Sequence, residues 1–361
     1  MAYTIAFFGT KPYDESSFTD KNKEFGFEIR YYKGHLNKNN VLLTQGVDAV
    51  CIFVNDIADA EVLRIMASNG VKLLALRCAG FNNVDLNAAA AAGITVVRVP
   101  AYSPYAVAEY TVALMLSLNR KIPRASWRTK DGNFSLHGLM GFDMHGKTAG
   151  IIGTGKIAKI LIHILKGFGM NILAYDLYPD YNFAREEKIV YTSLDELYHS
   201  SDIISLHCPL TEATKYLIND YSISKMKDGV MIINTGRGQL IHTNALIEGL
   251  KNKKIGSAGL DVYEEESEYF YEDQSDRIID DDVLARLLSF NNVIVTSPIT
   301  PSLLRATPPM LPDSRTTHAT PRLAPELMPS TEGPARGFRK TVCINKPLTP
   351  SPAPAIIAVR D

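Results

Sequence analysis

The sequence has 361 residues, which is enough for two domains of ordinary size, each with its own core. Its hydrophobic fraction of 46% and charged fraction of 21% are typical of a globular protein. Lysines and arginines (38) nearly balance aspartates and glutamates (39), which leaves a net charge of −1. Because such a chain creates no general basic field, we expect neither nucleic acid nor a membrane surface as its partner.

The cysteines and the N-terminus indicate a compartment. Cys51, Cys78, Cys208 and Cys343 are far apart, and the first three lie in apolar runs. This spacing predicts buried free thiols rather than a disulfide set or a zinc site, so no metal is expected. The N-terminus lacks a basic segment followed by a long apolar one, and no apolar stretch reaches the roughly 18 residues of a membrane span. We therefore expect a cytoplasmic protein.

The first hundred residues alternate between apolar, β-rich runs and helix-like segments. Strands are expected at 4–8, 49–54, 73–77 and 95–99, and helices at 17–25, 60–69 and 87–92. Alternation of this kind predicts a parallel sheet with helices on both faces. The turn at 78–83 directly follows a strand, and loops at the carboxyl edge of such a sheet bind ligands. It is therefore a candidate substrate loop.

A long apolar helix is expected at 105–120, with Ser103 as its cap and Pro104 in its first turn. Because it is apolar on most sides, it must be buried, either between domains or against a second subunit. We favour the subunit contact and hence a homodimer or higher homo-oligomer. Residues 121–147 show few strong periodic features.

The most informative stretch runs from residue 148 to Asp176. It contains an apolar strand, the turn Gly153-Thr154-Gly155-Lys156-Ile157-Ala158, a helix to residue 168, a strand at 171–175 and then Asp176. This order is that of a dinucleotide-binding unit. Gly153 allows the tight turn, and Gly155 lets the backbone approach the pyrophosphate at the helix N-terminus. Asp176 would accept hydrogen bonds from the ribose and repel a 2′-phosphate, which favours NAD over NADP.

Further strands are expected at 202–207, 229–234, 254–260 and 292–296. Arg237 lies between two glycines at a strand end, where its planar guanidinium suits a bidentate grip on a substrate carboxylate. Asp261 follows the next strand, and the acidic run at 264–266 is equally well explained as a solvated face.

Residues 1–297 resemble the D-isomer-specific 2-hydroxyacid dehydrogenase family, a match over about four fifths of the chain. The matching segments are LRCAGFNNVD (76–85), VPAYSP (99–104), GTGKI (153–157), SLHCPLT (205–211), GRG (236–238) and GLDVYE (259–264). The resemblance implies two doubly wound parallel-sheet α/β domains. These would be a flavodoxin-like substrate domain (1–100) and a Rossmann NAD-binding domain (101–297), with a C-terminal segment that returns to the substrate domain.

The resemblance also implies a reaction. NADH would give hydride to the keto carbon of pyruvate, yielding D-lactate, with glyoxylate, hydroxypyruvate or phenylpyruvate as alternative substrates. Arg237 matches the family's carboxylate-binding arginine, and Glu266 matches the glutamate that hydrogen-bonds a histidine acid/base. Backbone N–H groups of Ala79 and Gly80 would bind the substrate carboxylate, and Tyr102 would line the pocket. The implied cofactor residues are Gly153, Thr154, Gly155, Lys156, Ile157, Asp176, Cys208, Pro209, Thr235, Gly236 and Asp261.

From residue 298 the chain departs from the family pattern. The family's histidine should follow Val295-Thr296-Ser297, but Pro298 stands there. Thirteen of the 19 prolines lie in the last 64 residues, which also hold eight basic and four acidic residues. This composition predicts a disordered, mildly basic tail over 298–361 in place of the returning segment.

A shift of reading frame would explain this departure. Codons compatible with Pro-Ile-Thr-Pro-Ser-Leu-Leu at 298–304, read from the third base of the first codon, also permit His, then His or Tyr, then Ala-Phe-Phe-Thr. We expect that a frameshift or sequence error replaced the native C-terminus; the rival interpretation is a genuine divergent tail. Since a positioned acid contributes ~10²–10⁴ in rate, we expect slow or absent turnover. A non-catalytic NADH-binding sensor is therefore the alternative outside the enzymes.

Overall fold

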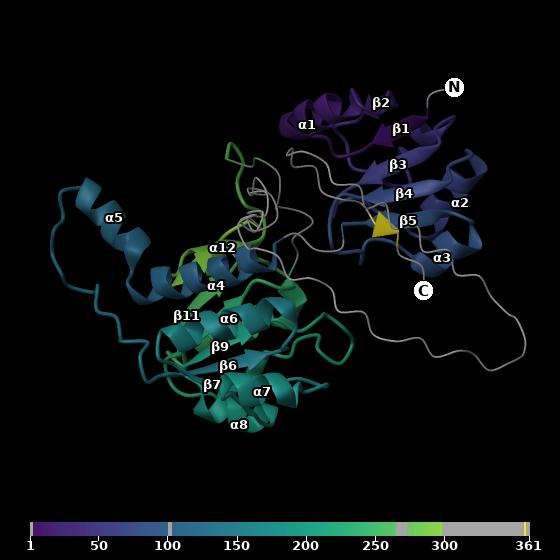
Figure 1. The fold of residues 1–361 in the computed structure, drawn as a ribbon. Coiled ribbons are helices and arrows are strands. Elements are labelled where there is room, and N and C mark those ends of the chain that lie inside the picture. Colours follow the sequence, from purple (N-terminus) through teal and green to yellow (C-terminus); the bar gives the residue numbers. More distant parts are fainter. Residues whose placement is uncertain (1–2, 100–102, 265–272, 274, 298–356, 359–361) are drawn as a thin grey trace, which may run out of the picture. The chain divides into compact units, whose positions relative to one another are not determined.

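The computed structural model describes residues 3–99, 103–264, 273, 275–297 and 357–358. Its strands form two sheets, one of six strands and one of seven (Figure 1). All strands run parallel to their neighbours except β13 (Ile357–Ala358), which pairs antiparallel with β5. The predicted class, two parallel-sheet α/β domains, is confirmed. Apart from these two residues, the tail predicted to be disordered lies outside the described residues.

The first sheet has the strand order β13-β5-β4-β3-β1-β2. Without β13 this is the doubly wound 2-1-3-4-5 order of flavodoxin-like domains. Its strands are β1 (Thr4–Phe7), β2 (Glu28–Tyr31), β3 (Ala49–Ile52), β4 (Leu73–Leu76) and β5 (Thr95–Arg98). Its helices are α1 (Pro12–Asn22), the 3-10 helix η1 (Val41–Thr44), α2 (Ala60–Ser68) and α3 (Leu86–Ala91). The expected helix at 17–25 thus begins earlier, at Pro12.

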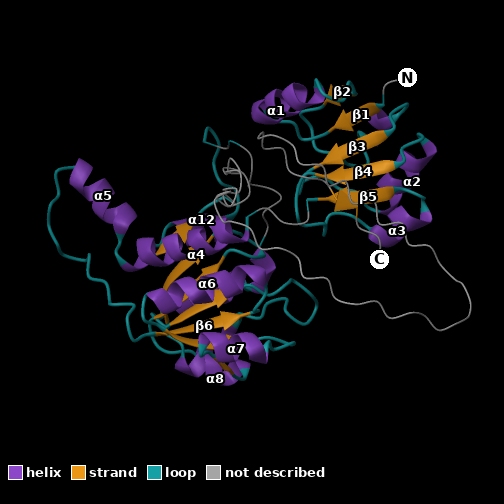
Figure 2. Cartoon of the chain, viewed as in Figure 1, coloured by secondary structure: helices purple, strands orange, loops and turns teal. Residues whose placement is uncertain are grey.

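The second sheet has the strand order β12-β11-β10-β9-β6-β7-β8. Counted within this sheet, the order 3-2-1-4-5-6 of a dinucleotide-binding domain is extended by one further strand. Its strands are β6 (Thr148–Ile152), β7 (Asn171–Tyr175), β8 (Val190–Tyr191), β9 (Ile203–Leu206), β10 (Val230–Asn234), β11 (Ile255–Leu260) and β12 (Val293–Val295). Figure 2 shows these strands side by side with the helices next to them.

The helices that follow β5 in the chain are α4 (Pro104–Asn119), α5 (Ile122–Lys130), α6 (Lys156–Gly167), α7 (Tyr181–Glu187), α8 (Leu194–Ser200), α9 (Asp220–Lys225), η2 (Gly238–Leu240), α10 (Thr243–Lys251) and α12 (Asp282–Leu288). The expected cap of α4 is confirmed, because the Ser103 side chain accepts a hydrogen bond from the N–H of Ala106. None of the described helices is long and apolar enough to cross a membrane.

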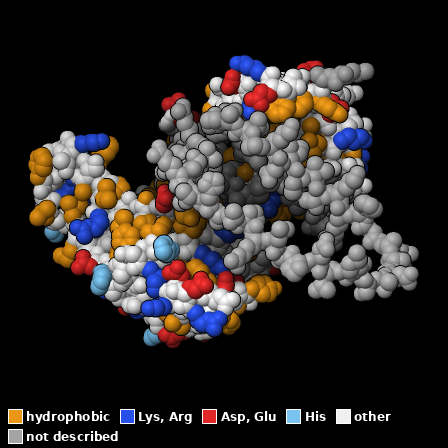
Figure 3. All heavy atoms as spheres, viewed as in Figure 1, with side chains coloured by type: hydrophobic (Ala, Val, Ile, Leu, Met, Phe, Trp, Pro, Cys, Tyr) orange, Lys and Arg blue, Asp and Glu red, His pale blue; other side chains and the backbone are white. Residues whose placement is uncertain are grey.

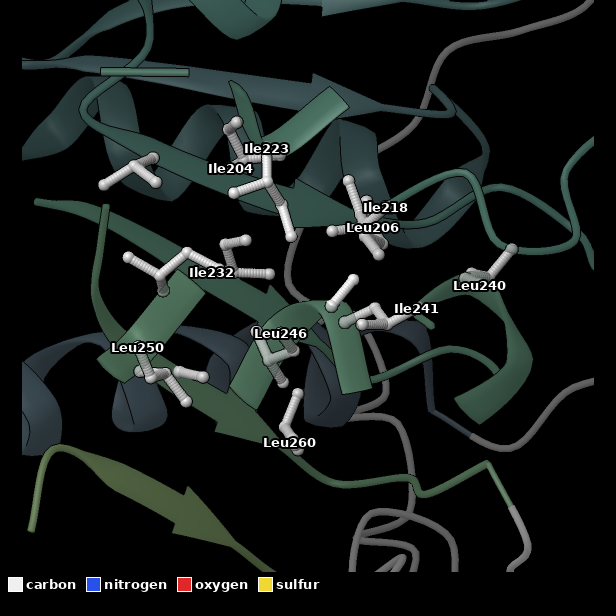
Figure 4. Packing of buried hydrophobic residues seen from close by; sticks show 14 of the residues in the cluster. Ile204, Leu206, Ile218, Ile223, Ile232, Leu240, Ile241, Leu246, Leu250 and Leu260 are labelled. Atoms are coloured by element: carbon white, nitrogen blue, oxygen red, sulfur yellow. The ribbon is translucent and has the colours of Figure 1, made fainter. Parts of the chain in front are cut away.

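A cluster of buried hydrophobic side chains packs against one face of the second sheet (Figure 4). Ile232 of β10 and Leu246 of α10 are both 0% exposed, and each such side chain contributes roughly 1.5–3 kcal/mol on burial. The labelled members of this cluster come from β9, β10, β11, α9, η2, α10 and nearby loops: Ile204, Leu206, Ile218, Ile223, Ile232, Leu240, Ile241, Leu246, Leu250 and Leu260.

One face of the helix expected to contact a second subunit packs within its own domain. Leu114, Met115 and Leu118 of α4 are buried in one cluster with Leu161 of α6 and Ile233 of β10. The burial of this face of α4 is therefore explained within its own domain, and the expected contact of the helix with a second subunit stays a prediction. The segment that seemed to lack periodicity forms α5 instead.

Candidate active site

The carboxyl edge of the second sheet gathers most of the predicted cofactor residues. The last residues of four neighbouring strands pair with one another in a row: Ile152, Leu206, Asn234 and Leu260. The chain leaves this edge at the residues that follow them, Gly153, His207, Thr235 and Asp261. In an open parallel sheet ligands bind at this edge, where the strand order reverses. That reversal lies between β6 and β9.

Gly153 and Gly155 meet different demands in the turn from β6 to α6. Gly153 has a φ of +89°, and a Cβ there would lie 2.5 Å from the backbone nitrogen of Cys208, so glycine is required. Gly155 is the N-cap of α6 with a φ of −67°, and a Cβ there would meet no described atom within 4 Å. The space next to Gly155 is therefore open, and the adjoining first-turn N–H groups of Lys156 and Ile157, at a helix N-terminus, suit an anion such as a pyrophosphate.

Asp176 follows β7 and is held as an anion. Thr154 donates its backbone N–H (2.6 Å) and its hydroxyl (2.8 Å) to Oδ2 of Asp176, and Tyr178 donates its N–H to Oδ1 (2.9 Å). Burial raises the pKa of this carboxyl, but these hydrogen bonds outweigh burial and leave the pKa below its ordinary value. An ionised carboxylate here can accept ribose hydroxyls and repel a 2′-phosphate.

The loop after β9 lies against the glycine turn. His207 Nε2 is 2.8 Å from Oγ of Ser205, and burial lowers the pKa of His207 to about 4, so its ring is neutral near pH 7. Burial raises the pKa of Cys208 to about 11, which keeps its thiol protonated. Pro209 follows with an exposed ring. These residues shape the turn rather than exchange protons. Cys51, Cys78 and Cys208 are free thiols, while Cys343 lies outside the described residues.

Hydrogen bonds hold the backbone of the Arg237 loop, and Arg237 itself is exposed. Asn234 accepts a hydrogen bond from the N–H of Gly236 (3.0 Å) and donates one to the carbonyl of Arg237 (2.8 Å). The hydroxyl of Thr235 lies 3.0 Å from that of Thr111 on α4. A Cβ on Gly238 would collide with the carbonyl of Tyr263. These contacts fix the backbone of the loop, and the exposed side chain of Arg237 carries a positive charge there.

Two acidic residues that follow β11, at the carboxyl edge of the second sheet, accept hydrogen bonds from other segments of the chain. Asp261 is 1% exposed and accepts a hydrogen bond from the hydroxyl of Thr296 (2.7 Å). Glu264 accepts from the hydroxyl of Tyr216 and from the N–H (3.1 Å) and hydroxyl (2.8 Å) of Thr243. For Glu264 the interpretation as a solvated face is therefore wrong.

The candidate substrate loop of the first sheet follows β4. Ala79 and Gly80 are half-buried there, and the carbonyl of Ala79 accepts a hydrogen bond from Nη1 of Arg98 (2.8 Å). Sγ of Cys78 donates to the carbonyl of Gly80 (3.2 Å). Three predicted positions, Tyr102, Glu266 and Pro298, lie outside the described residues.

Sequence reasoning missed Arg98, Thr111 and Glu264. Their partners lie far away along the chain, as the 124 positions between Thr111 and Thr235 illustrate. The sequence carries no local signal for such pairs, although the arginine at the end of a predicted strand could have been noticed.

Comparison with known proteins gives a consistent set of relatives. The NAD-binding domain of the D-isomer specific 2-hydroxyacid dehydrogenases matches residues 112–299. The D-lactate dehydrogenase of Escherichia coli K12 is 52% identical over 292 residues, which cover 81% of this chain and 88% of that protein. A putative D-lactate dehydrogenase of Dictyostelium discoideum is 47% identical over 295 residues, covering 81% and 86%.

Solved structures of D-lactate dehydrogenases are similar to this chain in fold as well as in sequence. The apo structure of the E. coli D-lactate dehydrogenase superimposes with a TM-score of 0.73 at 49% identity, covering 82% of this chain and 90% of that chain. The D-lactate dehydrogenase of Aquifex aeolicus, complexed with NAD and lactic acid, gives a TM-score of 0.73 at 34% identity, covering 82% and 88%.

Proposed function

This chain belongs to the D-isomer-specific 2-hydroxyacid dehydrogenase family, an NAD-binding oxidoreductase family, and from that premise we propose that it interconverts pyruvate and D-lactate. The observation that carries the proposal is the shared carboxyl edge of β6, β9, β10 and β11. There the glycine turn, the Arg237 loop and Asp261 emerge together. The same edge supports NAD as the cofactor, because the open space at Gly155 and the anionic Asp176 fit its pyrophosphate and ribose.

Each part of the chain has a proposed task. Residues 101–297 would bind NAD, which supplies the hydride when bound in reduced form. Residues 1–100 would carry the substrate loop, in which the N–H groups of Ala79 and Gly80 meet the substrate carboxylate. The guanidinium of Arg237 would grip the same carboxylate in a bidentate manner, and Tyr102 would line the pocket.

This chain lacks the family's proton donor. As hydride reaches the keto carbon, the carbonyl oxygen needs a proton. In the family pattern, which we propose that Glu266 retains, this glutamate would orient a histidine at position 298, but this sequence has proline there. Without that acid, turnover should fall by ~10²–10⁴, although the groups assigned to the carboxylate and to NADH remain.

Binding and turnover should therefore be measured separately. The tests are titration of NADH, titration of the pyruvate analogue oxamate onto the NADH complex, and NADH oxidation with pyruvate. We expect both ligands to bind. Arg237→Met should lose oxamate but keep NADH, and Arg237→Lys should recover part of the affinity. A chain that binds NADH but no oxamate would instead support the NADH-binding sensor, which has no use for a carboxylate grip.

The nucleotide sequence across codons 295–305 tests the origin of the tail. If the shifted frame encodes His-(His/Tyr)-Ala-Phe, a protein carrying the C-terminus of that frame should turn over pyruvate at least a hundredfold faster than the chain as written. If no frame encodes the run, the tail is native and the frameshift hypothesis fails.

We further propose a homo-oligomer that works in the cytoplasm, where free thiols such as Cys51 and Cys78 persist. We call residues 122–143, which comprise α5 and the segment after it, the arm. The arm carries the exposed side chains Ile122, Trp127, Phe134, Leu136 and Met140. Figure 3 shows hydrophobic side chains on this part of the surface. Several exposed apolar side chains in one segment are typical of a subunit contact.

A further inference from the structure

The loop after β4 is held by three successive carbonyl groups. The carbonyl of Cys78 accepts from the N–H of Val99 (3.2 Å), that of Ala79 from Nη1 of Arg98 (2.8 Å), and that of Gly80 from Sγ of Cys78 (3.2 Å). Each of these peptide units is therefore anchored by its oxygen.

An anchored carbonyl also fixes the next N–H. A peptide unit is planar, and in the trans form its C=O and N–H point in opposite directions. The described residues contain no cis peptide bond. The carbonyl of Ala79 and the N–H of Gly80 share one plane, so the bond from Arg98 determines where the Gly80 N–H points.

Arg98 is the strongest of the three anchors. A thiol is a weak donor and a backbone N–H is neutral, whereas a guanidinium makes a charge-assisted bond of roughly twice the strength. The side chain of Arg98 is half-buried at the end of β5. Its guanidinium carbon also lies 5.2 Å from the ring centroid of Phe81, which restrains it against the same loop.

We propose that Arg98 is a positioning residue for the substrate: by holding the Ala79 carbonyl, it aims the Gly80 N–H at the carboxylate of a 2-keto acid. Arg98 itself does not touch the substrate. The inference rests on the proposed function, in which the Ala79 and Gly80 N–H groups bind that carboxylate. It adds a residue from a third segment of the chain to the recognition of the acid group.

The test uses the full chain and two ligands. NADH is titrated first, and oxamate is then titrated onto the NADH complex, for the wild type, Arg98→Met, Arg98→Lys and the control Arg64→Met. Arg64 is an exposed arginine on α2 of the same domain. Thermal melting of each variant reports whether the domain still folds.

We expect Arg98→Met to weaken oxamate binding by about tenfold, as for the loss of one hydrogen bond to a charged group, while NADH affinity changes by less than about twofold. Arg98→Lys keeps a cation and should recover part of the loss, and Arg64→Met should match the wild type. Unchanged oxamate affinity in Arg98→Met overturns the inference. So does a loss of NADH affinity or melting temperature that Arg98→Lys shares in full, because Arg98 would then be structural only. If the wild type binds NADH but not oxamate, the proposed function fails, and this inference fails with it.

Discussion

Thr154 donates both its backbone N–H and its hydroxyl to the same carboxylate oxygen of Asp176, at 2.6 and 2.8 Å. The turn that is proposed to hold the pyrophosphate and the carboxylate that is proposed to hold the ribose are thus one hydrogen-bonded unit. Because these bonds lower the pKa of Asp176, the carboxylate stays ionised throughout the neutral range. A cofactor with an extra phosphate on this ribose would meet that negative charge.

Asp176→Asn should therefore change cofactor choice more than it changes stability. The amide keeps an oxygen for Thr154 but loses the charge and one acceptor. We expect NADH affinity to fall by about tenfold, the effect of losing a charge-assisted hydrogen bond of ~1.4 kcal/mol, and the preference for NADH over NADPH to shrink. Titrations of both cofactors measure this. Asp228→Asn, at an exposed carboxylate paired with Lys254, is the control, and an unchanged NADH/NADPH ratio in Asp176→Asn would contradict the assignment.

The two glycines of the turn should separate folding from binding. Gly153→Ala places a Cβ 2.5 Å from the backbone of Cys208 at a φ of +89°, so it should lower the melting temperature as well as NADH affinity. Gly155→Ala meets open space at an ordinary φ. It should melt like the wild type yet lose NADH, because its methyl group occupies the space proposed for the pyrophosphate. If Gly155→Ala bound NADH normally, the pyrophosphate would lie elsewhere.

This contrast also shows what sequence can and cannot predict. The strand at 171–175 and the glycine turn were predicted because their patterns are local. The edge strand β2 was missed because Glu28 and Arg30 alternate with Ile29 and Tyr31 over only four residues. Helix α5 was missed because its sequence, with Arg124, Arg128 and Lys130 beside Trp127, has no apolar face for its own domain core.

The candidate site divides in the same way. Gly153, Asp176 and Arg237 follow from the chemistry that each position demands. Arg98 and Glu264 act through residues distant in sequence, 19 positions to Ala79 and 48 positions to Tyr216, and no local pattern reports such a bond. The dimer contact stays a prediction for a related reason: an apolar helix predicts burial but does not say which surface provides it.

His207 should make the stability of the protein depend on pH. Burial lowers its pKa from 6.5 to about 4 in the folded protein, so the unfolded chain binds a proton more readily. The contribution of the neutral His207 ring to the free energy of unfolding is then complete above about pH 6.5. This contribution, about 3 kcal/mol, is lost as the pH falls toward 4. Melting of the wild type and His207→Gln from pH 7 to pH 4 measures this, and the variant should lose less stability over that range. His163→Gln, at an exposed histidine, should follow the wild type; equal slopes for His207→Gln would contradict the burial argument.

The arm offers the last test, of the proposed oligomer. Trp127 is the single tryptophan of the chain and is 70% exposed on α5, so most of its apolar surface is not buried within the described chain. Tryptophan is enriched among the residues that dominate subunit contacts, and an unpaired carboxylate buried at such a contact is strongly unfavourable. Trp127→Asp should therefore convert an assembly of two or more chains into single chains, as measured by light scattering during gel filtration. Its NADH affinity, measured by titration, should be unchanged.

Tyr221→Asp, at an aromatic residue 68% exposed on α9, controls for the added charge. A wild type that already runs as a single chain would refute the oligomer, and an assembly that survives Trp127→Asp would exclude this part of the arm as its contact.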